Sequence, residues 1–214
     1  MDLVSRTTLI VLIALGAAVA SFGFSSVART LQEEPRDEVT GVAAGPQEKE
    51  VDWRETYGKP GERLVFSVES LEVMPDGWKA RVSVENQTSI PYELGDPRAT
   101  LDRSFGLMLF SSGDLSELEE LNTSNSLPAI RAATRYVPEL PKILESGASW
   151  TGTISARGPL VAGSWVRVVF GSLISVGRPP DELDERVVWI TDHAYRLRRG
   201  EASTDQAIRA VNIA

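Results

Sequence analysis

Few residues in this chain carry side chains suited to covalent or acid–base catalysis. His193 is the single histidine, and it directly follows Asp192. A catalytic nucleophile needs a base that is itself held by a third group, and a histidine metal site needs further ligands. The chain has no cysteine, which excludes thiolate nucleophiles, zinc–thiolate sites, disulfides and a lipidated cysteine. We therefore expect His193 at the edge of a domain, and we predict no catalytic residue, no cofactor and no enzymatic activity.

Acidic residues cluster in one short stretch near the end of the chain. Asp181, Glu182, Asp184 and Glu185 carry oxygen ligands, but their spacing is not that of a calcium-binding loop. A solvated loop is the prediction, and no metal site is assigned. A calcium-binding or small-ligand-binding sensor or carrier is kept as the alternative function.

Aromatic side chains offer a binding chemistry instead. The chain has five tryptophans, and burial in a core is the usual role of this residue: Trp53, Trp78, Trp150, Trp165 and Trp189. Trp165 shares one face of an expected strand with Arg167, so this face is a candidate surface for a partner chain or a glycan. Leu115 and Leu118, on a short expected helix, belong to a second candidate surface.

A two-residue alternation of apolar and polar side chains in residues 61–195 predicts the strands that position these groups. In residues 64–73 the apolar positions change from even to odd numbers near Ser70, which predicts a β-bulge there. The clearest alternation covers residues 78–84. Further strands are expected at 105–110, 133–137, 150–156, 166–170 and 187–191. About seven or eight strands separated by turns predict an all-β fold, an antiparallel β-sandwich.

Residues 114–141 interrupt the strand pattern and form an expected insertion. Asp114 precedes three leucines at helical spacing, and Glu117 follows it three residues later, the arrangement of a capping box. We therefore expect a short helix here, capped by Asp114.

Residues 1–29 indicate attachment to a membrane. No charged residue occurs in residues 7–28, and at about 1.5 Å per residue a helix of this length crosses a hydrocarbon core of about 30 Å. The prediction is an uncleaved signal anchor that contacts the lipid bilayer through residues 7–28. The N-terminus would then be cytoplasmic and the C-terminal domain extracytoplasmic. A cleavable signal peptide ending near Ala18–Val19–Ala20, which would give a secreted product, is the alternative.

The segments on either side of the expected domain are polar. Residues 30–60 are acidic, are interrupted by glycine and proline and show no sustained period, which predicts a flexible linker. Residues 196–214 form the expected C-terminal tail, whose first arginines are Arg196, Arg198 and Arg199. A loosely attached end is expected, and docking of this tail on the linker acids is the alternative.

The overall charge limits the kinds of partner. The formal net charge is −8, whereas a nucleic-acid binder needs clustered lysine and arginine to neutralise phosphates. We therefore predict that the chain does not bind nucleic acid.

Several segments resemble a bacterial family of exported immunoglobulin-like domains of unknown function. The matching features are Gly61 before the first strand and the segments FSVESLEV, WKARVSVEN, and LESGASWTGTISARG followed by VRVVFG. The resemblance covers about Gly61 to Asp192. The resemblance implies an anchor or signal, a linker and a single immunoglobulin-like sandwich, with no agreed catalytic residues. It implies a membrane-anchored extracytoplasmic module that binds an envelope protein or glycan or has a structural role. Residues 114–141 depart from the compact family pattern.

Overall fold

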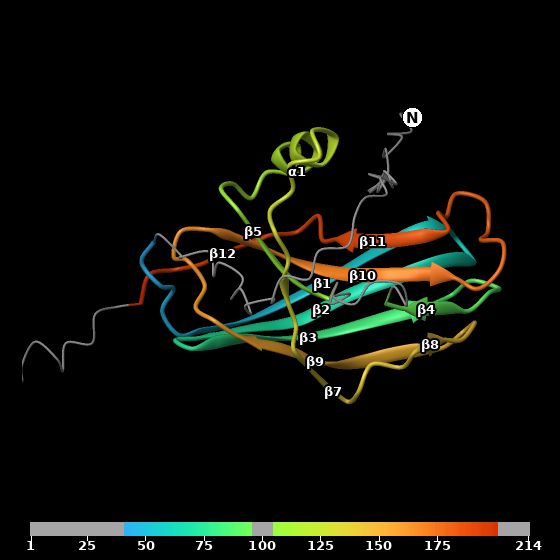
Figure 1. Cartoon of the computed structure of the whole chain (residues 1–214), viewed down its shortest axis with the longest axis horizontal. Helices are drawn as coiled ribbons and strands as arrows, with labels where there is room; N and C mark the ends of the chain where they lie inside the picture. Colours follow the sequence, from blue (N-terminus) through green and yellow to red (C-terminus); the bar gives the residue numbers. More distant parts are fainter. Residues whose placement is uncertain (1–40, 96–104, 201–214) are drawn as a thin grey trace, which may run out of the picture.

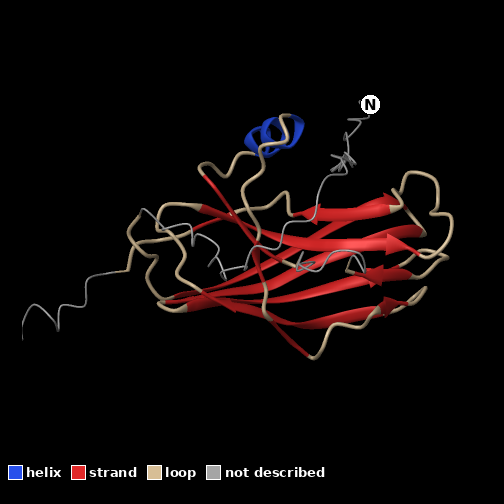
Figure 2. Cartoon of the chain, viewed as in Figure 1, coloured by secondary structure: helices blue, strands red, loops and turns tan. Residues whose placement is uncertain are grey.

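The computed structural model describes residues 41–95 and 105–200, which form two antiparallel β-sheets with an apolar core between them. Figure 1 and Figure 2 show the two sheets stacked face to face, with one short helix outside them. Every pair of neighbouring strands is antiparallel. The predicted all-β class and the two-sheet arrangement are confirmed.

The first sheet has the strand order β1-β2-β3-β9-β7. Its strands are β1 (Gln47–Lys59), β2 (Glu62–Met74), β3 (Gly77–Asn86), β9 (Ser149–Arg157) and β7 (Arg135–Val137). In β3 the apolar side chains are buried and alternate with exposed or half-buried polar ones, as the sequence pattern predicts. The β2–β3 register shifts between Val68 and Ser70, which confirms the predicted bulge.

The second sheet is built around the long strand β10 (Trp165–Ser175). β5 (Gly106–Phe110) and β12 (Tyr195–Arg196) pair with the start of β10, and β4 (Tyr92–Leu94) and β11 (Arg186–Ile190) pair further along it. β6 (Arg131–Ala132) pairs with β5, and β8 (Ile143–Leu144) pairs with β4.

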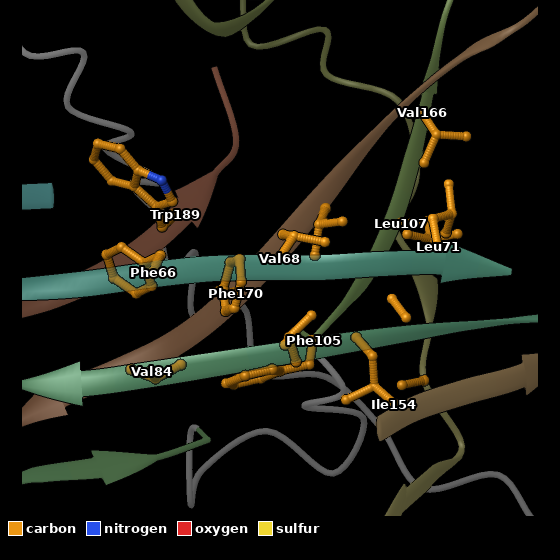
Figure 3. Close-up of a cluster of buried hydrophobic side chains, with 14 of the residues drawn as sticks. Phe66, Val68, Leu71, Val84, Phe105, Leu107, Ile154, Val166, Phe170 and Trp189 are labelled. Carbon is orange, nitrogen blue, oxygen red and sulfur yellow. The ribbon is translucent and has the colours of Figure 1, made fainter. Parts of the chain in front are cut away.

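Aromatic rings from both sheets fill the centre of the core (Figure 3). The Trp189 ring on β11 stacks on the Phe66 ring of β2, with centroids 5.3 Å apart and an interplanar angle of 6°. Phe105, directly before β5, meets Phe170 of β10 edge to face at 5.7 Å. It also meets Trp150 of β9 at 6.2 Å. These contacts join the two sheets through one continuous core.

Helix α1 (Leu115–Thr123) lies on the outer face of the second sheet, away from the first sheet (Figure 1). Leu118 is buried there in a second apolar cluster with Met108, Phe110, Val169 and Ile190. The first part of the insertion predicted at residues 114–141 therefore covers a sheet face that would otherwise expose apolar side chains, whereas its later residues form strands β6 and β7 of the two sheets.

The helix begins differently from the prediction. Asp114 occupies the N-cap position, but its side chain makes no capping hydrogen bond. Instead the Glu117 carboxylate accepts from the backbone N–H groups of Ser111 and Ser112, at 3.3 and 2.8 Å. Burial acts to raise the pKa of Glu117, but these hydrogen bonds outweigh it and leave the pKa below its usual value.

The predicted linker is wrong for residues 47–59, which form β1. Tyr57 and Glu55 are buried, while most other side chains of β1 are exposed or half-buried. β1 is an edge strand, and edge strands carry charges that block further pairing, so its composition is close to that of a linker. The predicted tail also starts too early, because Arg196 belongs to β12 and Arg199 forms a bridge with Ala44.

The predicted membrane segment, residues 7–28, lies outside the described residues, as does the linker up to residue 40. Within residues 41–95 and 105–200, no helix is long and apolar enough to cross a bilayer.

Candidate binding pocket

A pocket of about 990 Å³ lies at the end of the domain where the described chain begins and ends. Its walls come from three segments: Gly41–Val42, the residues from Val161 to Trp165, and the residues from Ala194 to Arg199. Residues far apart in the sequence thus meet in one concave surface.

Backbone hydrogen bonds hold these walls together. Val42 accepts from the N–H of Ala162 at 2.9 Å, and Leu197 donates to Ser164 and accepts from Gly163 at 2.8 Å each. The N–H of Gly45 donates to the carbonyl of Arg198 at 3.1 Å. Because backbone groups of all three walls are paired with one another, the side chains remain available to a ligand.

The side chains lining the pocket are aromatic, aliphatic and cationic. Alternation along residues 195–198 buries Leu197 and turns Arg196 and Arg198 outward. Arg199 is also exposed, and Val42 is 52% exposed. Within the part of the chain that the structure describes, none of these three guanidinium groups has an ion pair or a side-chain hydrogen bond. Three positive charges without an ionic partner among the described residues therefore lie beside apolar side chains of the pocket.

Trp165, predicted as part of a partner surface, lines the pocket. The ring is half-buried and packs on Gly113, where an added Cβ would lie 2.6 Å from a ring carbon. Tyr195, which pairs across from Val166, adds a second half-buried aromatic side chain. The indole ring of Trp165 therefore packs where only a glycine fits at position 113.

A buried carboxylate fixes the segment that leads into the pocket wall. Glu55 on β1 accepts from the indole N–H of Trp189 at 2.7 Å and from the backbone N–H groups of Asp192 and His193 at 3.0 and 3.2 Å. Oε1, which accepts from the His193 backbone N–H, also lies 2.7 Å from Nδ1 of His193. Burial and the nearby Glu55 carboxylate raise the pKa of Asp192.

Arg167 holds the same segment from the opposite side. Its guanidinium donates to the carbonyls of Gly113 and Asp114 at 3.0 Å each, to that of Thr191 at 2.9 Å, and to that of Asp192. The group also lies 5.4 Å from the centre of the Phe110 ring. Burial lowers the pKa of Arg167, against the opposing influence of nearby carboxylates.

The prediction that Arg167 forms a partner-binding face with Trp165 is wrong. Arg167 is completely buried, because α1 and the loop before it cover the outer face of β10. Leu118 is likewise buried at 1% exposure, whereas Leu115 is 41% exposed. Each of the two predicted surfaces therefore keeps one accessible residue: Trp165 lines the pocket and Leu115 is exposed on α1, whereas Arg167 and Leu118 are buried.

His193 lies at the domain edge, as predicted from the sequence. Its side chain is 54% exposed and its ring stacks on Trp53 at 5.7 Å. Nδ1 contacts Glu55, and in the described residues no hydroxyl group is hydrogen-bonded to the other ring nitrogen. The geometry therefore positions the 191–193 segment, which leads directly to Ala194 and the pocket.

The acidic loop near residue 184 has a structural contact of its own. The hydroxyl of Tyr57 donates to Asp184 at 2.7 Å. Across residues 41–95 and 105–200, no group of three or more histidine or acidic side chains is placed to hold a metal ion.

Sequence reasoning missed Val42 and Tyr195 as pocket residues and treated the three arginines as part of a tail. The alternation of tyrosine, arginine, leucine and arginine at residues 195–198 was the available signal for a strand. Nothing in the local sequence indicates that Val42 lies beside it. No family model, no curated protein and no solved structure matches the chain.

Proposed function

We propose that this protein is a membrane-anchored, extracytoplasmic, non-catalytic binding module with an immunoglobulin-like sandwich. Its partner would be a polypeptide with an acidic, extended segment. This segment would enter the pocket at the end of the domain where the described chain begins and ends. The anchor in this proposal is the uncharged stretch of residues 7–28.

The pocket chemistry is the observation that carries the proposal. Arg196, Arg198 and Arg199 gather at one site of a chain whose net charge is −8. Guanidinium groups bind carboxylates in a bidentate geometry, and arginine, tryptophan and tyrosine are enriched in protein interfaces. Trp165 and Val42 would pack against apolar side chains that flank the acids of the partner.

The non-catalytic part of the proposal is supported by how the polar groups near the pocket are used. Both oxygens of Glu55 are occupied by indole, imidazole and backbone donors. The hydrogen bonds of Arg167 go to backbone carbonyls. These contacts hold the wall of the pocket in place.

Binding is tested with the full-length protein and a synthetic peptide of alternating glutamate and leucine, followed by tryptophan fluorescence. We expect saturable binding that weakens at high salt and is lost in R196Q/R198Q/R199Q. The matched control is R54Q/R81Q, which removes arginines on β1 and β3 that already have glutamate partners. Equal binding by the wild type and the pocket variant would reject the pocket as the binding site.

Membrane topology is tested separately. A reporter that is active only outside the cytoplasm, fused after Ala214, is expected to be active. Activity of a cytoplasm-only reporter at the same position would refute the extracytoplasmic placement.

A further inference from the structure

The chain reaches the pocket directly from its acidic N-terminal region. Gly41 and Val42 are themselves pocket residues, and an added Cβ on Gly41 would lie 2.6 Å from a side-chain carbon of Val161. The described chain therefore begins at the pocket.

The residues just before this point carry charges opposite to those of the pocket. Residues 33–38, called the acidic segment below, contain Glu33, Glu34, Asp37 and Glu38 together with one cation, Arg36. Pro35 lies in the middle and biases its neighbour Glu34 towards an extended backbone.

The distance is short enough for the acidic segment to reach the arginines. At about 3.3–3.6 Å per residue, Glu38 lies within about 10 Å of Gly41 and Glu33 within about 30 Å. A segment tethered this closely has an effective concentration on the order of 1 mM at the pocket. An acidic partner free in solution competes against that local concentration.

We propose that the acidic segment docks in the pocket of its own chain and that a partner must displace it. Its carboxylates would pair with Arg196, Arg198 and Arg199. The inference rests on the proposed function in that both assign the same pocket, but it names an intramolecular occupant. It also makes the approach of the domain to its membrane depend on whether the pocket is filled, because the acidic segment precedes the domain in the tether.

The absence of cysteine allows a direct test in the full-length protein. Cysteines are introduced as E34C in the acidic segment and A194C in the pocket wall, and the disulfide is followed on non-reducing gels under mild oxidation. We expect an intramolecular disulfide that forms several-fold more slowly in high salt.

The matched control carries the same two cysteines with E33Q, D37N and E38Q. This control keeps the chain length and Pro35, so the reach of the segment is unchanged and only its charge is reduced. A several-fold slower disulfide in the control supports docking by charge. Equal rates would mean proximity alone and would overturn the inference, as would a disulfide-linked dimer whose yield falls on dilution.

A second measurement separates this inference from the proposed function. E33Q/E34Q/D37N/E38Q without cysteines is expected to bind the glutamate–leucine peptide several-fold more tightly than the wild type. Equal affinity in both proteins would overturn the intramolecular occupant and leave the pocket assigned to an external partner. If neither protein binds the peptide while the disulfide depends on charge, the inference stands and the proposed external partner fails.

Discussion

Two of the largest polar side chains in the core, Tyr92 and Arg167, are buried in contrasting ways. The hydroxyl of Tyr92 has no hydrogen-bond partner within the described residues, and burial raises the pKa of this phenol to about 12. The two Nη groups of Arg167 instead donate to four backbone carbonyls, and only its buried Nε has no hydrogen-bond partner within the described residues. An unpaired buried polar group lowers the free energy of unfolding. Removal of a paired group also lowers it, because the partners are then left without their hydrogen bonds.

Tyr92→Phe is therefore expected to stabilise the protein. At pH 7 the free energy of unfolding should rise by about 1 kcal/mol, because an unsatisfied hydroxyl is removed. The raised pKa means that the wild type loses stability as pH rises above 10, where the unfolded chain ionises first. By pH 11 the advantage of Y92F should grow by about 1 kcal/mol. Urea unfolding at both pH values measures this.

The control for this prediction is Tyr57→Phe. The hydroxyl of Tyr57 donates to Asp184 at 2.7 Å, so its removal at pH 7 should cost about 1 kcal/mol. Opposite signs for the two tyrosines are expected. A loss of stability in Y92F would show that its hydroxyl is hydrogen-bonded in solution.

Arg167→Met should be strongly destabilising. It leaves the carbonyls of Gly113, Asp114, Thr191 and Asp192 without their donors, at a cost of at least about 3 kcal/mol. Arg167→Lys keeps the charge but has no planar fork to reach all four, so an intermediate loss is expected. Urea midpoints rank the three proteins. A methionine variant as stable as the wild type would contradict this account of the buried arginine.

At the level of elements, α1 contributes one buried side chain and leaves its neighbour outside. Leu118 packs on the outer face of β5, β10 and β11, and Leu115 is 41% exposed. A surface helix of this length owes its stability to such packing, since short helices are marginal by themselves.

Leu118→Ala is expected to lower the free energy of unfolding by about 2–4 kcal/mol, because it opens a cavity beneath the helix. Leu115→Ala is the matched control and should change it by less than about 0.5 kcal/mol. Thermal unfolding of both variants measures the difference. Similar losses would mean that α1 is not anchored through Leu118.

The sequence predicted the structure correctly for strands that bury one face and expose the other. The alternation in β3 and the phase change in β2 follow from burial on a single side, and both were predicted correctly. β1 was missed because its edge position favours charge over apolar content. Arg167 was misplaced because a helix from elsewhere in the chain covers its face, and no local period reports that contact. The pocket was out of reach for the same reason, since its walls meet only in the folded chain.

At the level of the whole molecule, one core serves both sheets. Phe66 of the first sheet stacks on Trp189 of the second, and Glu55 of the first binds the segment that follows Trp189. Neither sheet can therefore separate without exposing the inner face of the other.

We expect the domain to unfold in a single cooperative step. In urea, tryptophan fluorescence and far-ultraviolet circular dichroism should give the same midpoint, because each sheet depends on the other for its core. Two separated transitions would show that one sheet persists alone and would contradict the shared core.

The first and the last described residues of the domain lie side by side at one end of the sandwich. Ala44 forms a bridge with Arg199, and the backbones of Gly45 and Gly200 approach so closely that an added Cβ on Gly45 would lie 2.0 Å from Cα of Gly200. Because these two ends are adjacent, the order of the strands along the chain can be changed without changing which strands pair. A circular permutant that joins residue 200 to residue 41 through a short peptide, with new ends in the Pro75–Asp76 turn, would keep every ladder intact. Because its two ends are adjacent, the domain can also be inserted into a surface loop of another protein without moving the two sides of that loop apart.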